Sequence, residues 1–315
     1  MPKRASEGMN NSVIVILGPT ASGKTKLAVR WAKQLNAEII SADSRQVYRG
    51  MDVGTGKDLD EYRIDGQVIN HHLIDVVEAG EAYNVQRFQE DFWRAYRHIN
   101  DRKKRVILCG GSGMYLQAVL QNFEFTAVPT NAPLRHELDG ETDQNLRAIF
   151  EATPSIYSAK ADTSTRKRLI RAIEIGAFLQ HNPLPSPQNG AQKVEFEIFG
   201  IDVPLQIRRQ KISQRLHQRL QNGLIEEVQR LLNGGVLPER LIYYGLEYKF
   251  VTQYLTGALN YQIMVSQLEV AIHQFAKRQM TFFRSMERNG LTINWINPDG
   301  NYLTLTTSTL NISGA

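Results

Sequence analysis

The segment from Gly18 to Thr25 combines residue types that can bind phosphate groups. It reads Gly18-Pro19-Thr20-Ala21-Ser22-Gly23-Lys24-Thr25 and fits the pattern G-x-x-x-x-G-K-[ST] of a phosphate-binding loop. In such a loop, backbone N–H groups and the start of the following helix form a cradle for a di- or triphosphate. Lys24 would place a cation on the phosphates, and the Thr25 hydroxyl would be placed to bind Mg²⁺. The pattern indicates a phosphorylated ligand, but not what is done to it.

A second residue with possible chemistry is Asp43, which follows a predicted short strand at residues 38–42. A carboxylate at this place could bind a metal ion, directly or through water, or accept a proton as a general base. Alternatively, Asp43 is structural and caps the turn into Ser44-Arg45-Gln46. Phosphoryl-transfer enzymes with this loop usually also carry an acid after a second apolar strand. The candidate strand at residues 105–109 is followed by Gly110-Gly111-Ser112-Gly113, which contains no acid.

These residues need strands and helices to position them. Apolar, β-branched stretches predict strands at residues 13–17, 38–42 and 105–109, and helical spacing predicts helices at 26–32, 88–100 and 114–120. This alternation predicts an α/β fold with a parallel sheet flanked by helices, similar to the P-loop NTPases. Ligands of such sheets bind at the carboxyl ends of the strands. We therefore expect Asp43 and residues 110–113 to lie near the phosphate-binding loop.

The rest of the chain is predicted to be mostly helical. Residues 122–160 are polar and interrupted by prolines, with short helices expected at 134–138 and 145–151 and a longer one at 165–180. Further patterns predict a strand at 194–201, helices at 206–222, 224–233, 245–254 and 261–288, and a hairpin at 291–307. We expect a core built from residues 11–121 and about 193–315, with a smaller helical insertion at about 122–192.

Composition narrows the class of protein. Of the 315 residues, 42% are hydrophobic, and no apolar run approaches the ~20 residues of a membrane span. The first residues lack the apolar core of a signal peptide, and the single cysteine, Cys109, excludes an internal disulfide and a cysteine-based zinc site. We expect a cytoplasmic protein that does not bind membranes. The net charge of +5 permits a nucleic-acid partner without requiring one.

Several further motifs carry a resemblance to a known family. In chain order they are the phosphate-binding loop, Ser41-Ala42-Asp43-Ser44-Arg45-Gln46-Val47-Tyr48-Arg49, Gly54-Thr55-Gly56-Lys57, His71-His72-Leu73-Ile74-Asp75, Gly110-Gly111-Ser112-Gly113-Met114-Tyr115-Leu116, Arg168-Leu169-Ile170-Arg171-Ala172-Ile173-Glu174, Gly223-Leu224-Ile225-Glu226-Glu227-Val228 and Ala276-Lys277-Arg278-Gln279-Met280-Thr281. With these motifs the chain resembles the tRNA dimethylallyltransferases, also called isopentenyl-diphosphate:tRNA transferases. The resemblance extends from residue 13 to about residue 284.

The resemblance implies a reaction at the phosphate-binding loop. It implies that the loop holds dimethylallyl diphosphate and that the allyl group is moved to N6 of the adenine just 3′ of the tRNA anticodon. Asp43 matches the general base of the family, and Thr20 matches a residue whose hydroxyl can bond the bridging oxygen of the diphosphate. Mg²⁺ and an arginine would stabilise the leaving diphosphate. Arg215 lies in the segment where the family supplies such a cation.

The resemblance also implies contacts with the anticodon stem-loop of tRNA. We expect the protein to be a monomer. Around the acceptor base they would involve Asp43, Ser44, Arg45, Gln46 and Ser112. Elsewhere they would involve Lys167, Arg168, Leu169, Ile170 and Arg171, and then Lys277, Arg278, Gln279 and Arg284.

The chain also departs from the family pattern. Asp58 stands where the family usually has proline, Ile272-His273 replaces Thr-Arg, the motif around Gly245 is changed, and the insertion at 122–160 is short. Three alternatives therefore accompany the transferase hypothesis. An adenylate isopentenyltransferase would act on a free nucleotide, and the basic clusters argue against it. A small-molecule kinase is disfavoured by the missing strand-end acid, and a non-catalytic RNA-binding paralogue by the presence of Asp43.

Overall fold

The computed structural model describes residues 12–121, 124–185 and 194–297. The chain divides into a larger unit, residues 1–120 with 193–315, and a smaller unit, residues 121–192. Each unit is described by itself. In the part of the chain that the structure describes, no helix is long and apolar enough to cross a membrane.

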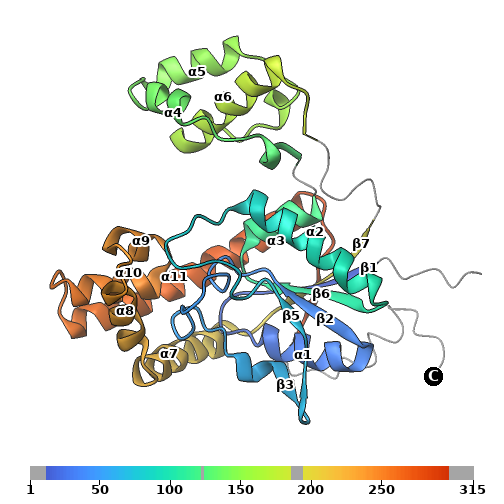
Figure 1. Ribbon diagram of the computed structural model, residues 1–315, viewed down its shortest axis with the longest axis vertical. Helices are drawn as coiled ribbons and strands as arrows, with labels where there is room; N and C mark the ends of the chain where they lie inside the picture. The colour runs from blue at the N-terminus through green and yellow to red at the C-terminus, as the bar shows by residue number, and fades with distance from the viewer. Residues whose placement is uncertain (1–11, 122–123, 186–193, 298–315) are drawn as a thin grey trace, which may run out of the picture. The chain divides into compact units, whose positions relative to one another are not determined.

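The larger unit contains a six-stranded sheet in the order β5-β2-β6-β1-β7-β8, in which every pairing is parallel (Figure 1). Its central strands are apolar and β-branched, which is typical of strands that are buried on both faces. The predicted parallel α/β architecture is confirmed. The strands are β1 (Ser12–Leu17), β2 (Ala37–Ser41), β5 (His71–His72), β6 (Arg105–Gly110), β7 (Glu195–Ile201) and β8 (Asn294–Ile296).

Helices cover both faces of this sheet (Figure 1). On one face, Ile14 and Ile16 of β1 pack with α1 (Lys24–Leu35), which contributes Leu27. On the other face, Val13 and Val15 pack with α2 (Val85–Asp101), α3 (Gly113–Leu120) and the carboxyl-terminal helices. Those helices are α7 (Leu205–Gln221), α8 (Leu224–Asn233), α9 (Pro238–Tyr243), α10 (Leu246–Leu255) and α11 (Tyr261–Arg288).

Two features near the ends of the sheet differ from the sequence prediction. Residues 294–296, which lie within the hairpin predicted at 291–307, form β8 and extend the main sheet beside β7; residues 298–307 of that prediction lie outside the described residues. The chain also forms a small antiparallel sheet from β3 (Arg63–Ile64) and β4 (Gln67–Val68), after the 3₁₀ turn Leu59–Tyr62. Asp65 and Gly66 connect these two strands, both with positive φ, as an Asp-Gly hairpin turn requires.

A buried carboxylate joins β2 to its neighbours. Glu38 is buried and accepts hydrogen bonds from Asn70 and Arg102, and its carboxylate lies 2.7 Å from His72 Nε2. Burial alone would raise the pKa of this carboxyl, but the hydrogen bonds from His72, Asn70 and Arg102 outweigh it and lower the pKa to about 2. Glu38 therefore stabilises the fold as an anion.

The smaller unit contains α4 (Ala132–Asp139), α5 (Asp143–Ala152) and α6 (Arg166–His181). Each helix is preceded by a capping residue, and these are Asn131, Thr142 and Thr165. Their side-chain oxygens accept the backbone N–H groups of Leu134, Asn145 and Arg168 respectively. The helices pack around an apolar core of Leu138, Leu146, Leu169, Ile170 and Ile173. The predicted helix at 165–180 is confirmed to within one residue at each end.

Candidate active site

The phosphate-binding loop connects β1 to α1. Ala21 and Gly23 have positive φ values of 59° and 85°, so the backbone turns sharply before the helix begins at Lys24. Gly23 is the N-cap and has no side chain to bond the first N–H groups of α1. Unsatisfied N–H groups at a helix start bind anions well. The loop therefore has the geometry that the pattern predicts.

Lys24 is held inside this loop. Its Nζ donates to the carbonyl oxygen of Pro19 over 2.7 Å. Burial lowers the pKa of Lys24 to about 8, and the charge of Arg215 acts in the same direction, while Asp43 raises it. A phosphate group placed beside Nζ would restore the charged form, because an opposite charge offsets the cost of burial.

The ends of β2 and β6 meet beside the loop, as the parallel sheet predicts. Asp43 Oδ1 accepts the backbone N–H of Arg45 at 2.9 Å, and Ser44 N donates to Ser112 Oγ at 2.9 Å. A Cβ atom on Gly110 would collide with the backbone of Ala42. The glycines after β6 thus permit close contact between two strand ends.

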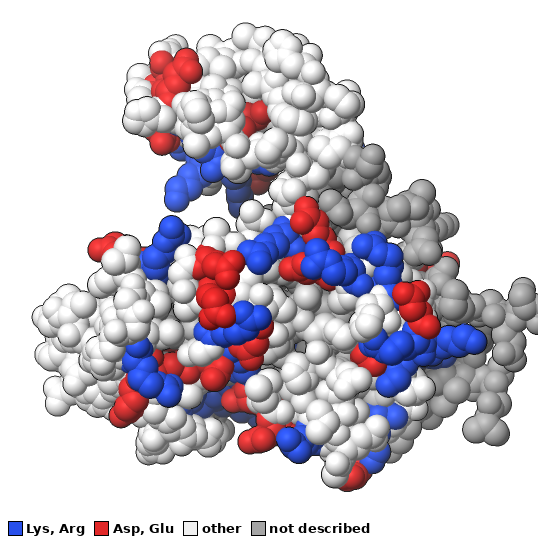
Figure 2. Space-filling model, in the orientation of Figure 1, with Lys and Arg blue, Asp and Glu red and all other residues white. Residues whose placement is uncertain are grey.

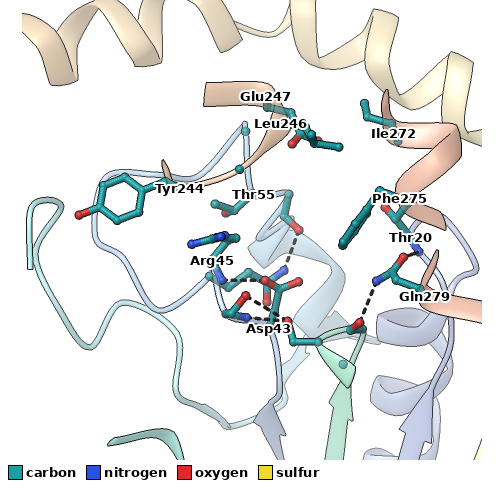
Figure 3. Close-up of a pocket in the computed structure, with 18 of the residues that line it drawn as sticks. Thr20, Asp43, Arg45, Thr55, Tyr244, Leu246, Glu247, Ile272, Phe275 and Gln279 are labelled. Atoms are coloured by element: carbon teal, nitrogen blue, oxygen red, sulfur yellow. Dashed lines mark hydrogen bonds between the residues drawn. The ribbon is translucent and has the colours of Figure 1, made fainter. Parts of the chain in front are cut away.

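Gln279 of α11 connects the phosphate-binding loop to β6. Its Oε1 accepts the N–H of Thr20 at 2.9 Å, and its Nε2 donates to Gly111 O at 2.8 Å (Figure 3). A side chain on Gly111 would approach Gln279 Nε2 to 2.6 Å, which explains the glycine. The amide therefore fixes Thr20 relative to the end of β6. RNA contact by Gln279 was predicted from the resemblance and stays a prediction.

A pocket of about 600 Å³ opens between these loops and the helices α10 and α11. Its polar side includes Thr20 and Asp43, and an apolar side is formed by residues such as Leu246, Ile272 and Phe275 (Figure 3). Lys24 also lines the pocket. A second, more polar pocket of about 800 Å³ shares Lys24 and Thr25 with the first, together with Arg215 and Arg219. The two pockets meet at the residues that could hold a diphosphate.

Arg215 and Arg219 come from α7 and reach the loop at residues 54–58. Arg215 pairs with Asp58 at 2.6 Å and donates to Gly56 O at 3.3 Å. Arg219 is largely enclosed, pairs with Glu247 at 3.0 Å and donates to Gly54 O. Burial lowers the pKa of Arg219, and the neighbouring Arg215 charge adds to that effect. Gly56 has a φ of 61°, and a side chain there would collide with both guanidinium groups.

The loop at residues 52–54 is fixed by Glu227 of α8. This buried carboxylate accepts the N–H groups of Asp52, Val53 and Gly54 at 2.7–2.9 Å, and the hydroxyl of Tyr248 at 2.7 Å. The motif that contains Glu227 and the motif that begins at Gly54 are thereby one structural unit. Sequence reasoning noted both motifs but did not connect them.

Gln46 lines the first pocket with its amide already engaged. Ser41 Oγ donates to its Oε1 at 3.0 Å, and its Nε2 donates to Gly56 O at 3.0 Å. One amide hydrogen and one lone pair are left for a ligand. The part of the chain that the structure describes contains no group of three or more His, Cys, Asp or Glu residues that could hold a metal. Thr25 is the predicted Mg²⁺ contact that lines both pockets.

The predicted RNA-binding residues of the smaller unit have two different roles. Leu169 and Ile170 are core residues. Arg171 bonds buried Glu174 and the carbonyls of residues 128 and 129. Lys167 is exposed, and Arg168 pairs with exposed Asp162 at 2.8 Å. Lys167 and Arg168 are therefore the side chains of this group that are offered to a ligand.

Charges of both signs are interspersed on one face of the larger unit. On the face in Figure 2, Lys and Arg alternate with Asp and Glu instead of forming a continuous basic surface. On α11, Lys277, Arg278 and Arg284 are exposed, and of these only Arg278 lines the first pocket. An RNA contact on the face in Figure 2 would therefore rest on local cations.

A model of the IPP transferase family matches residues 46–286 of the chain. The tRNA dimethylallyltransferase 1 of Parabacteroides distasonis is 51% identical over 284 residues, which cover 90% of this chain and 92% of that protein. The chain belongs to the IPP transferase family. The Geotalea uraniireducens tRNA dimethylallyltransferase 1 is 48% identical, with coverage of 94% and 95%.

Solved structures of IPP transferases share the fold. The full-length tRNA isopentenylpyrophosphate transferase of Bacillus halodurans aligns with a TM-score of 0.68 and 30% identity over 96% of this chain and 95% of that chain. A eukaryotic dimethylallyltransferase acting on tRNA aligns with a TM-score of 0.73, 22% identity and coverage of 95% and 77%, which supports the fold. The resemblance stated from the motifs is confirmed at the level of family and fold.

Proposed function

We propose that this IPP transferase moves the dimethylallyl group from dimethylallyl diphosphate to N6 of the adenine 3′ of the anticodon in tRNA. The observation that carries the proposal is the first pocket, where an anion-binding loop, the Asp43 carboxylate and an apolar wall meet. Each part suits one part of the reaction: the diphosphate, the acceptor amine and the five-carbon chain. The names of the bacterial relatives support tRNA as the acceptor.

The diphosphate is held by the loop and by the cations around it. Backbone N–H groups at the start of α1, together with Lys24 and Arg215, bind the phosphate oxygens. As the C–O bond of the donor breaks, its electron pair leaves with the diphosphate and negative charge increases there. Donors that are already oriented stabilise this charge without reorganising. The Thr20 hydroxyl, positioned by Gln279 through the Thr20 backbone, would bond the bridging oxygen.

Mg²⁺ fits this arrangement. Mg²⁺ is usually bound by one or two protein oxygens together with substrate phosphates and water, and the structure offers the Thr25 hydroxyl at a wall that both pockets share. When bound, Mg²⁺ would supply Lewis-acid stabilisation of the leaving diphosphate.

Asp43 acts as the general base. The N6 lone pair forms the new C–N bond as the C–O bond breaks, and the N6 proton passes to the Asp43 carboxylate. A neutral aryl amine is a weak nucleophile, so a positioned proton acceptor assists the attack. Asp43 Oδ1 already accepts the N–H of Arg45, which orients the carboxylate.

The apolar wall receives the dimethylallyl chain, and the adenine must leave its stack to reach it. Leu246, Ile272 and Phe275 offer hydrocarbon surface on α10 and α11. Extruding the adenine costs a few kcal/mol, which contacts in the pocket offset. Ile272, a departure from the family pattern, adds apolar surface.

The proposal is tested by product analysis. The protein is incubated with Mg²⁺, dimethylallyl diphosphate and either unmodified tRNA or adenosine monophosphate, and the digested products are analysed by mass spectrometry. We expect prenylated adenosine from tRNA and none from the free nucleotide. Prenylation of the nucleotide alone would indicate an adenylate isopentenyltransferase. Absence of any product, beside a working control enzyme, would refute the proposal, and ATP hydrolysis at kinase rates would favour a kinase.

A further inference from the structure

The corner between α9 and α10 exposes an aromatic ring beside the pocket. Tyr243, the last residue of α9, is 66% exposed. The guanidinium carbon of Arg45 lies 5.4 Å from the centroid of its ring, a cation–π arrangement. Arg45 lines the pocket two residues after Asp43, and its Nε lies 3.8 Å from the position a Cβ on Gly245 would take. Tyr243 and Arg45 together are called the rim pair below.

The next residue holds this corner rigidly. The ring of Tyr244 is buried against Tyr48 with a centroid separation of 4.4 Å. Its hydroxyl accepts the N–H of Gly80 at 2.6 Å and donates to Glu81 O at 3.3 Å. Tyr243 is therefore placed by a fixed neighbour while its own ring faces solvent. A ligand that contacts the ring would order little of the chain on binding.

Cations with unused donors surround the same pocket. Within residues 12–121, 124–185 and 194–297, the side chains of Arg45, Lys249 and Arg278 make no hydrogen bond or ion pair, although all three line the pocket. The arginines deeper in the site differ, since Arg215 and Arg219 are paired with Asp58 and Glu247. The rim of the pocket therefore offers positive charge and an aromatic face to the same partner.

We propose that the rim pair is a stacking site for an unpaired nucleobase next to the adenine that enters the pocket. The proposal rests on the function proposed above and extends it from the acceptor base to its neighbours. Single-stranded RNA is bound by aromatic rings and arginine planes on which bases stack, with nearby cations on the phosphates. An acidic protein partner would use the cations but would gain nothing specific from the ring. Stacking tolerates any base, so the rim pair contributes affinity for the loop and little sequence preference.

The test measures binding of a fluorescent anticodon stem-loop RNA by anisotropy, without prenyl donor. The variants are Tyr243→Ala, Tyr243→Phe and Tyr243→Leu, with Tyr261→Ala as the matched control. Tyr261 is an exposed tyrosine, 46% accessible, that lines neither pocket. We expect the dissociation constant to rise about tenfold in the alanine variant, by a similar factor in the leucine variant and by less than about twofold in the other two. The affinity for pyrophosphate reports that each variant is folded and should not change.

A set of abasic RNAs makes the test specific to a base. Each RNA lacks one loop base beside the acceptor adenine. When the missing base is the one that stacks on Tyr243, the wild type and Tyr243→Ala should bind the abasic RNA with equal affinity, because the stacking partner is then absent from both complexes. Equal affinity of wild type and Tyr243→Ala for the intact RNA would overturn the proposal. It would also be overturned if Tyr243→Ala bound every abasic RNA more weakly than the wild type does, because the contact of Tyr243 would then not be with a base. Because binding is measured without the donor, failure of prenyl transfer would refute the proposed reaction and not this site.

Discussion

Replacing Asp58 by asparagine should tighten the binding of pyrophosphate. Asp58 pairs with Arg215 at 2.6 Å, and Arg215 is a cation that the proposed function assigns to the diphosphate. A phosphate oxygen must compete with this carboxylate for the same guanidinium. Asp58 has a φ of 42°, a conformation that asparagine tolerates better than other residues. The substitution therefore removes the charge with little strain.

The expected gain in pyrophosphate affinity follows from the solvent exposure of the Arg215–Asp58 ion pair. Unit charges about 4 Å apart interact by about 1 kcal/mol in water and about 4 kcal/mol at the lower effective dielectric near a protein surface. The side chains of Arg215 and Asp58 are 31% and 46% exposed, so the smaller figure applies, in keeping with the roughly 0.2–1 kcal/mol typical of exposed ion pairs. Release of about 1 kcal/mol corresponds to a dissociation constant about fivefold lower.

Isothermal titration calorimetry with pyrophosphate and Mg²⁺ measures this effect. Asp60→Asn is the matched control. Asp60 lines the second pocket, as Asp58 does, but among the described residues it forms no ion pair with an arginine. We expect less than about a twofold change in the control, and a smaller difference between the variants at high salt. Weaker binding by Asp58→Asn would contradict this prediction and indicate that Asp58 orients Arg215 for the ligand. Equal effects of the two substitutions would also contradict it, because the change in affinity would then not depend on the pair with Arg215.

Three further predictions concern residues that support the site or the fold. Gln279→Leu leaves the buried Gly111 carbonyl and the partly buried Thr20 N–H without partners. It should lower the free energy of unfolding by about 2 kcal/mol, measured in urea, and also reduce kcat; unchanged kcat would exclude a positioning role. Glu227→Gln cannot accept all four hydrogen bonds of the carboxylate, so the midpoint temperature of unfolding should fall, and an unchanged midpoint would contradict that role. Because the pKa of Glu38 is lowered to about 2, its stabilising effect is complete above about pH 4.5 and is lost as the pH falls toward 2. Over that pH range, the free energy of unfolding of the wild type should fall by about 3 kcal/mol more than that of Glu38→Gln, as measured by urea unfolding at each pH. Parallel curves of unfolding free energy against pH for the two proteins would contradict the lowered pKa.

The sequence predicted best what local patterns determine. The strand-loop-helix around Gly18–Thr25 follows from apolar runs and glycine positions, and the place of Asp43 beside it follows from a general property of parallel sheets. The 28 residues of α11 were predicted in full, since Asn260 caps its start and no breaker interrupts it.

Contacts between distant segments could not be predicted in this way. Glu227 looks like an ordinary charged residue of an amphipathic helix, and nothing nearby shows that its carboxylate binds three N–H groups at residues 52–54. Leu169 and Ile170 were assigned to RNA contact as part of a motif, although their spacing also fits a buried helix face. The hairpin at β3–β4 did have a local signal, because Asp65-Gly66 is a dipeptide typical of two-residue hairpin turns.

In the proposed reaction, Asp43 removes the proton from the acceptor amine while the diphosphate is held beside it. Single-turnover prenyl transfer to tRNA, with both substrates saturating, tests it most directly in the Asp43→Asn variant. Asparagine retains the oxygen that accepts the Arg45 N–H, so the turn is preserved while the base is removed. We expect a transfer rate roughly 10²- to 10⁴-fold lower than in the wild type, with dissociation constants for tRNA and pyrophosphate that stay within about twofold. A transfer rate close to that of the wild type would contradict it.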